Sequence, residues 1–286
     1  MPRPREQTRN SIVKKRKIIL VSWLRKIYPF LPQEIPGPIA VLYEKVAMGG
    51  LRGFHQQVAS EITSSLKSGK ILDVGTGPGQ LLIEITRRNP NIELVGFDLS
   101  RKMLKIAKKL TEPPRFLAKA RTGAKACAGT TATDPAPRTV STNLGSGLIR
   151  FVRGDVRNLP FSDGEFDLVV STLSLHHWHN AARGLQECLR VTVPGGRCWI
   201  YDLRTDVPAR THAKLVTGEG LGRLARSWIF KFHGVNPKQY EARTVSSWLV
   251  GATVEVEVHA AYLKLNIEKT LCESQVLRGV EAGLAL

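Results

Sequence analysis

Apolar residues along the middle of the chain fall into two kinds of segment: short apolar runs, and longer stretches with apolar residues at helical spacing. The short runs predict strands, at 70–74, 92–97, 149–152, 166–172 and 197–201. Helices are expected at 43–66, at 80–88, and after Ser100, which would act as an N-cap. Apolar strands that alternate with helices are typical of a parallel sheet covered on both faces.

The end of the chain has a different pattern. Residues 253–258 and 262–267 alternate apolar and polar positions. Such alternation predicts an antiparallel pair of strands at one edge of the sheet. Together the two patterns indicate an α/β protein.

Two stretches depart from these patterns. Residues 1–36 form a basic arm whose first 26 residues carry nine Lys or Arg against the single acid Glu6, and part of it is expected to be an amphipathic helix. Residues 113–147 are rich in Ala, Thr, Gly, Ser and Pro, and are expected to be a flexible insertion. The predicted organisation is therefore an arm at 1–36 and one domain at 37–286 that contains the insertion.

Charge and cysteine content narrow the setting. The formal net charge of +18 favours an anionic contact without choosing between nucleic acid, a membrane surface and an acidic small molecule. The four cysteines show no C-x-x-C spacing, which argues against a structural zinc site and a disulfide framework and favours the cytoplasm. No apolar run approaches the ~20 residues that span a bilayer.

The strand at 70–74 leads into a glycine-rich turn, Asp73-Val74-Gly75-Thr76-Gly77-Pro78-Gly79, that precedes a helix. Glycines at such a turn let a ligand approach the bare backbone amides. Asp98, 19 residues beyond Gly79, ends the next strand, close to the ~20 residues expected for a carboxylate that binds ribose hydroxyls. Gln80 stands where the dinucleotide fingerprint has its third glycine, so a nucleoside cofactor without phosphates is favoured.

This turn and the segments that follow it resemble the successive motifs of the class I S-adenosylmethionine (SAM)-dependent methyltransferases. The later segments are 95–100, 154–161, 166–171 continuing to His176-His177, and 193–197. The resemblance covers 42–267 and is to the small-molecule subgroup that includes ubiquinone and menaquinone C-methyltransferases. It implies a Rossmann-like three-layer αβα sandwich, with a mostly parallel seven-stranded sheet whose last strand is antiparallel.

The resemblance also implies which residues bind SAM. Those expected at its methionine end are Asp73, Gly75, Thr76, Gly77, Gly79 and Ser171. Those expected at its ribose and adenine are Asp98, Leu99, Met103, Asp155 and Val156. Simpler interpretations stay open, because Asp98 could cap a strand, Met103 could be a core residue and Asp155 a turn residue.

Three residues are candidates for chemistry on the methyl acceptor. His176 and His177 follow the strand at 166–172, at the end where open α/β sheets bind ligands. Tyr43 resembles the lid tyrosine that lies near SAM in relatives. The alternatives are loop histidines with a structural hydrogen bond and a core tyrosine. His179 lies close by, but without a carboxylate or thiol partner no metal site is expected.

The function expected is SAM-dependent methyl transfer, by in-line displacement, to a small-molecule acceptor that the sequence does not identify. One alternative is an RNA methyltransferase that holds nucleic acid with the arm, although the arm has few aromatic residues for stacking on bases. The other is a SAM-binding protein without transfer activity. The arm itself could rest on an anionic membrane surface or lie as a helix over the active site.

Overall fold

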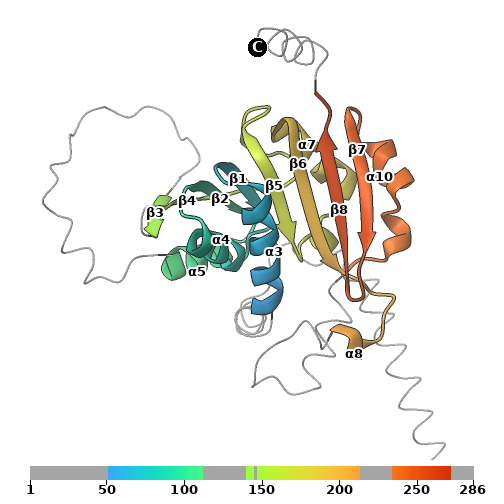
Figure 1. Cartoon of the computed structure of the whole chain (residues 1–286), viewed down its shortest axis with the longest axis horizontal. Helices are drawn as coiled ribbons and strands as arrows, with labels where there is room; N and C mark the ends of the chain where they lie inside the picture. Colours follow the sequence, from blue (N-terminus) through green and yellow to red (C-terminus); the bar gives the residue numbers. More distant parts are fainter. Residues whose placement is uncertain (1–50, 112–139, 145–146, 213–233, 272–286) are drawn as a thin grey trace, which may run out of the picture. The chain divides into compact units, whose positions relative to one another are not determined.

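The computed structural model describes residues 51–111, 140–144, 147–212 and 234–271, all within the unit Ile35–Leu286 (Figure 1). The predicted basic arm and Tyr43 lie outside these residues. In the part of the chain that is described, no helix is long and apolar enough to cross a membrane.

One sheet organises the described residues (Figure 1). Its strands are β1 (Gly69–Val74), β2 (Ile92–Asp98), β3 (Val140–Leu144), β4 (Gly147–Arg153), β5 (Phe166–Thr172), β6 (Thr192–Leu203), β7 (Ala252–Val258) and β8 (Tyr262–Lys269). Their order is β3-β4-β2-β1-β5-β6-β8-β7. The run from β4 to β6 is parallel, whereas β8 is antiparallel to both of its neighbours.

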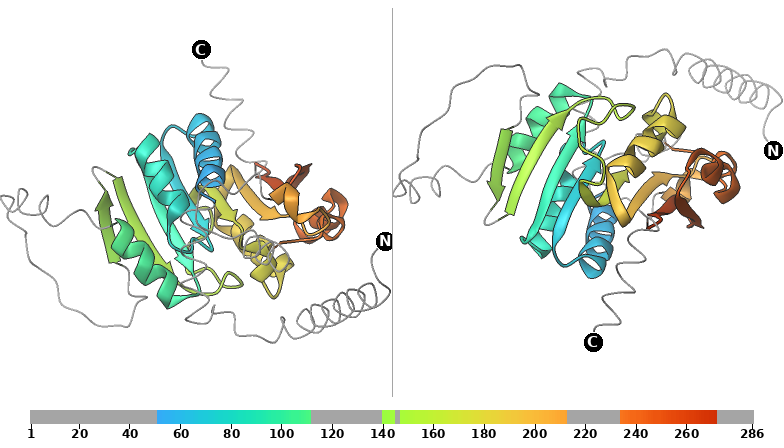
Figure 2. Two further views of the ribbon diagram at one scale, coloured as in Figure 1. Left: turned by 90° about the horizontal axis from the view of Figure 1, so that it is seen from below. Right: turned by 90° about the horizontal axis from the view of Figure 1, so that it is seen from above.

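Helices cover both faces of this sheet, which confirms the predicted three layers (Figure 2). One face carries α3 (Arg52–Ser65), α4 (Gln80–Arg88) and α5 (Arg101–Thr111), and the other carries α7 (Ala181–Val191) and α10 (Ala242–Trp248). Short helical turns complete the connections: η3 (Leu175–His177), α8 (Ala209–His212) and η4 (Pro237–Gln239).

The predicted antiparallel last strand is confirmed as β8, and the predicted C-terminal pair as β7 and β8. The described sheet has eight strands, where seven were expected, because β3 is added at its edge. Residues 140–144 therefore form a strand inside the stretch expected to be a flexible insertion. β3 and β4 pair antiparallel with only Gly145 and Ser146 between them, a spacing typical of a tight hairpin. Residues 113–139 of that stretch lie outside the described residues.

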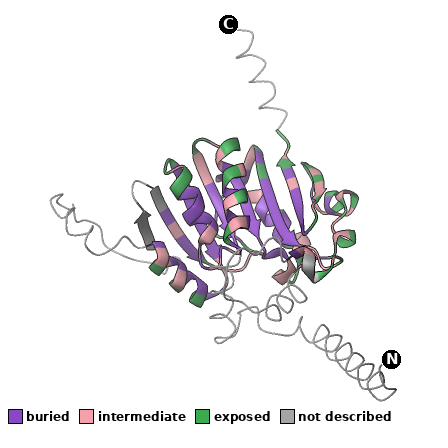
Figure 3. Ribbon diagram, turned by 60° about the horizontal axis from the view of Figure 1, so that its bottom comes forward, coloured by how far each residue is buried: buried purple, intermediate pink, exposed green. Residues whose placement is uncertain are grey.

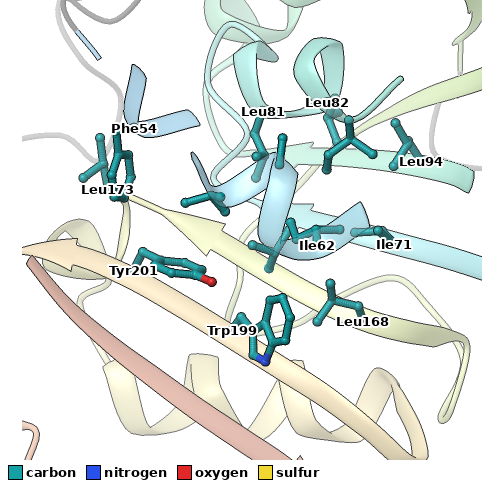
Figure 4. Packing of buried hydrophobic residues seen from close by; sticks show 14 of the residues in the cluster. Phe54, Ile62, Ile71, Leu81, Leu82, Leu94, Leu168, Leu173, Trp199 and Tyr201 are labelled. Atoms are coloured by element: carbon teal, nitrogen blue, oxygen red, sulfur yellow. The ribbon is translucent and has the colours of Figure 1, made fainter. Parts of the chain in front are cut away.

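The α3 face shows why the apolar runs form the sheet. Trp199 of β6 and Leu168 of β5 pack in the same cluster as Ile62 of α3, which is fully buried (Figure 4). The central strands are buried along most of their length (Figure 3). Burying one such side chain stabilises the fold by about 1.5–3 kcal/mol, so this packing fixes the strand ends that carry the site.

Ser100 caps α5, as the sequence predicts: its Oγ accepts a hydrogen bond from the amide of Met103 at 3.4 Å. Replacing Ser100 with Ala is expected to lower the free energy of unfolding by about 1 kcal/mol, since the amide loses its partner. Urea unfolding measures this loss. Ser60→Ala, at an exposed position of α3, is the control and is expected to change stability by less than about 0.5 kcal/mol. Equal effects of the two changes would contradict the cap.

Candidate functional site

The candidate site lies along the carboxyl edge of the parallel strands. The glycine turn follows β1, Asp98 ends β2, Asp155 follows β4 and His176 follows β5. Parallel strands end at the same edge of a sheet, so the fold brings together motifs that are far apart in the sequence.

The amides of the glycine turn have partners within the chain. The amides of Gly75 and Thr76 both donate to the carbonyl of Phe97, at 2.8 and 3.0 Å, and the amide of Gly79 donates to the carbonyl of Thr76. The amide of Gly77 donates to Asp98 Oδ2 at 2.9 Å. The expectation that these amides are bare is therefore wrong, since they hold the turn against β2.

The three glycines of the turn all have positive φ, but the space around them differs. A Cβ on Gly75 would lie 2.0 Å from the Oγ of Ser174, and one on Gly79 would lie 3.3 Å from Ala107. A Cβ on Gly77 would meet no atom of the described residues within 4 Å. The close approach that requires glycine at Gly75 and Gly79 is thus within the protein, and Gly77 alone of the three faces open space.

Asp73 presents a buried carboxylate beneath this turn. Its side chain is 1% exposed, and Oδ2 accepts a hydrogen bond from Thr76 Oγ1 at 2.7 Å. Oδ1 has no hydrogen-bond partner among the described residues. Burial, opposed by the Thr76 hydrogen bond and reinforced by the charge of Asp98, raises the pKa of Asp73 to about 7. A buried carboxylate with one oxygen lacking a described partner is suited to a cationic ligand, which would stabilise its ionised form.

Ser171, at the end of β5, is the second buried polar group of the site. It is fully buried, and its Oγ also has no hydrogen-bond partner among the described residues. β5 lies directly beside β1, with Val170 paired to Asp73. Two neighbouring strands thus end in polar atoms that a bound ligand would satisfy.

The residues expected at the ribose and adenine follow β2. Asp98 is half-buried, and besides the amide of Gly77 it accepts the amide of Ser100 on Oδ1 at 2.7 Å. Leu99 is half-buried, whereas Met103 is 2% exposed and packs inside the protein.

Asp155 has a partner that the sequence analysis missed. The amide of Arg157 donates to Oδ1 at 2.9 Å, and its guanidinium donates to both oxygens, with Nη2 2.6 Å from Oδ2. These hydrogen bonds, more than the charges of Arg157 and His179, hold the pKa of Asp155 below its usual range. The lowered pKa favours the ionised carboxylate, which can accept a hydrogen bond from a ligand. Arg157 already donates to both of its oxygens. Val156 is half-buried and packs against the α7 face.

His176 also has a carboxylate partner that was not foreseen. Its Nδ1 lies 2.9 and 2.8 Å from the two carboxylate oxygens of Asp202, at the end of β6. The ring of His177 lies 4.0 Å from that of His176, tilted by 43°. The expectation that these histidines lack a carboxylate is therefore wrong. Asp202 could have been noticed, because like Asp98 it ends an apolar strand.

No group of three His, Cys, Asp or Glu side chains placed to bind a metal ion occurs within the described ranges. Each oxygen of Asp202 instead accepts hydrogen bonds from the protein, from His176 and from the amide of Leu203. His176 thus pairs with a carboxylate that two backbone amides hold in place.

Comparison with known proteins agrees with the motifs. Residues 65–120 and 117–200 each match a family model described as a methyltransferase domain. The chain is 30% identical to a demethylmenaquinone methyltransferase of Deinococcus radiodurans over 169 residues, which is 58% of this chain and 57% of that protein. It is 26% identical to a ubiquinone/menaquinone biosynthesis C-methyltransferase of Geotalea daltonii over 177 residues, 60% and 63% of the two chains. The chain thus spans less than two thirds of the length of these curated relatives.

Among solved structures, the fold is similar to that of the plantazolicin methyltransferase BpumL in complex with a pentazolic desmethylPZN analogue and SAH. The TM-score is 0.56 at 14% identity, and the match covers 82% of this chain and 90% of that one. At this identity the likeness shows a shared fold.

Proposed function

Because the chain belongs to the class I SAM-dependent methyltransferases, we propose that it transfers a methyl group from SAM to a small-molecule acceptor. The observation that carries this proposal is the buried Asp73 carboxylate, whose Oδ1 has no partner in the described part of the chain. It lies under a glycine turn where Gly77 faces open space. The α-ammonium group of a methionine moiety supplies the cationic donor that such a carboxylate lacks.

The described residues fit SAM at several points. Asp73, Gly77 and Ser171 would hold the methionine end, and Asp98 the ribose hydroxyls. Leu99, Met103 and Val156 would flank the adenine, with its amino group on Asp155 beside Arg157. SAM supplies a methyl group on a sulfonium, which is a good leaving group. The protein therefore contributes mainly alignment and exclusion of water.

For the acceptor we propose a quinone-like ring compound, in its reduced form. The support is the names of two similar proteins, a demethylmenaquinone methyltransferase and a quinone-biosynthesis C-methyltransferase. Methylation at a ring position replaces a proton, so a base is needed. His176 is proposed as this base, and His177, whose ring lies beside it, would help to hold the acceptor.

The setting proposed is the cytoplasm. Cys188 and Cys198 are both free and buried, as in a reducing environment. The basic arm could bring the protein to an anionic membrane that holds a quinone, or cover the site. Co-sedimentation with vesicles of anionic lipid, with and without residues 1–36, separates these roles, because equal binding would contradict the membrane role.

Incubation with methyl-labelled SAM tests the proposed function. Three acceptor pools are compared: reduced demethylmenaquinone, an aqueous metabolite extract, and total RNA. We expect label in a small-molecule product, at a rate that falls at least about 100-fold in His176→Gln if that residue is the base.

Each other outcome is informative. Label found only in RNA would support the RNA alternative and contradict the proposal. Micromolar SAM binding by calorimetry without transfer to any pool would indicate a SAM-binding protein. Label in the aqueous extract alone would keep the methyltransferase and reject the quinone.

A further inference from the structure

The strongest unassigned feature at the carboxyl edge of the sheet is the contact between His176 and Asp202. Both side chains are buried, 4% and 1% exposed. They come from different elements, η3 after β5 and the end of β6. Burying such a pair costs desolvation free energy unless hydrogen bonds satisfy its polar atoms. The hydrogen bonds of Asp202 therefore indicate how the pair is stabilised.

The hydrogen bonds of Asp202 identify it as an acceptor. Oδ2 accepts the backbone amide of His176 at 2.9 Å, and Oδ1 accepts the amide of Leu203 at 2.7 Å. A carboxylate held by two N–H donors is stabilised in its ionised form. The nitrogen facing it, His176 Nδ1, must then carry the hydrogen and donate it.

We infer that Asp202 is a positioning residue for His176: it fixes the Nδ1–H tautomer and the ring orientation, so that Nε2 is the nitrogen that accepts a proton. In the reaction proposed above, on which this inference rests, the acceptor's nucleophilic atom forms the bond to the methyl group. The sulfur keeps the electron pair of the broken bond, and the proton lost by the acceptor goes to His176 Nε2. Asp202 stays ionised and stabilises the imidazolium that results.

The chain between β5 and η3 is shaped to make this contact. Leu173 has φ 57°, a conformation that costs a non-glycine residue about 1–2 kcal/mol. Its side chain is buried in the cluster on the α3 face, whereas Leu175 is buried in the cluster on the other face. The backbone thus crosses the sheet edge within three residues, which carries His176 onto Asp202. Strain held in place by packing at such a point is common at functional sites.

Two further ionisable groups near the pair are His177 and Tyr240. His177 lies beside His176 on η3, with ring centroids 4.0 Å apart. Burial, together with the charge of Asp202, raises the pKa of Tyr240 to about 12. Asp202 is thus a carboxylate in direct contact with the His176 ring.

Nitrogen-15 NMR of the histidines in the ligand-free protein tests the tautomer. In the unchanged protein we expect the Nδ1–H form of neutral His176, assigned by its absence in His176→Gln. In Asp202→Asn the amide can donate to Nδ1, so we expect the tautomer to switch to Nε2–H. Asp206→Asn is the matched control. Asp206 lies four residues after Asp202 and pairs with Arg204, so this change should leave the tautomer of His176 unaltered.

Kinetics test the consequence for transfer. Asp202→Asn is expected to lower kcat by roughly 10²–10⁴-fold, with the Kd for SAM within threefold of that of the unchanged protein. The pH dependence of kcat should also change, because the ring is no longer held in one tautomer. Asp202→Glu should restore part of the rate.

The outcomes separate this inference from the proposed function. An Nε2–H tautomer in the unchanged protein, or no switch in Asp202→Asn, would overturn the inference whatever the activity. A switch accompanied by an unchanged kcat and pH profile would overturn the role in transfer. If no acceptor is methylated but the switch occurs, the proposed function fails while the positioning of His176 by Asp202 stands.

Discussion

Replacing Asp73 with Asn is expected to weaken SAM binding by about 100-fold or more, because a buried ion pair loses one partner. The isosteric amide keeps the acceptor for Thr76 Oγ1 but not the charge that would face the ammonium group. Isothermal titration calorimetry at pH 8 measures the loss. Glu93→Gln, which removes a half-exposed carboxylate beside Lys70, is the control and should leave the Kd unchanged. A change in Kd below threefold for Asp73→Asn would contradict the assignment of Asp73.

The same substitution should stabilise the ligand-free protein above neutral pH. Burial, as the main cause, raises the pKa of Asp73 in the folded protein to about 7, from its ordinary value of 3.8. The folded protein thus holds a proton that the unfolded chain releases. Its contribution to stability is complete below pH 3.8 and is lost as the pH rises through 7, up to about 4 kcal/mol in all.

Urea unfolding at pH 5 and pH 8 checks the sign. The unchanged protein should lose stability between these values relative to Asp73→Asn, which has no carboxylate to ionise. SAM affinity of the unchanged protein should move the opposite way, rising with pH through 7, since the ionised carboxylate binds the ammonium group. A parallel pH dependence of stability in both proteins would contradict the raised pKa.

Gly75→Ala is expected to be far more destabilising than Gly77→Ala. At Gly75 the new Cβ would lie 2.0 Å from Ser174 Oγ, in addition to the strain of a positive φ. Overpacking costs about 1–3 kcal/mol. The φ adds about 1–2 kcal/mol. At Gly77 no atom in the described part of the chain lies within 4 Å of the new Cβ, so only the backbone strain is expected.

A second substitution tests this cause. Ser174→Gly removes the atoms that the methyl group would meet, leaving only the Ser174 Cα at 3.9 Å. In that background Gly75→Ala should cost about 1–3 kcal/mol less than in the unchanged protein, as a double-mutant cycle would show. Equal costs in both backgrounds would contradict the contact. Gly77→Ala should instead mainly lower SAM affinity, because its side faces the open space.

The sequence alone determined the parallel α/β core, because continuous apolar strands and amphipathic helices follow from residue spacing. The strand at 166–172 and the helix at 80–88 have the bounds that the sequence predicts. The glycine turn was recognisable for a local reason as well, since positive φ at Gly75, Gly77 and Gly79 is a property of the residues themselves. The edge strand β3 was missed because its short polar run lies in a stretch without apolar periodicity.

Only the tertiary structure decided which polar groups meet. The contact between His176 and Asp202 joins residues 26 apart, and Arg157 occupies the carboxylate expected to face the adenine. The sequence located the amides of the glycine turn, but the structure showed them bonded to β2 and to Asp98. The physical reason is common to all three cases: strand and helix formation follow from local pattern, whereas burial and hydrogen bonding of a side chain depend on what the folded chain places beside it.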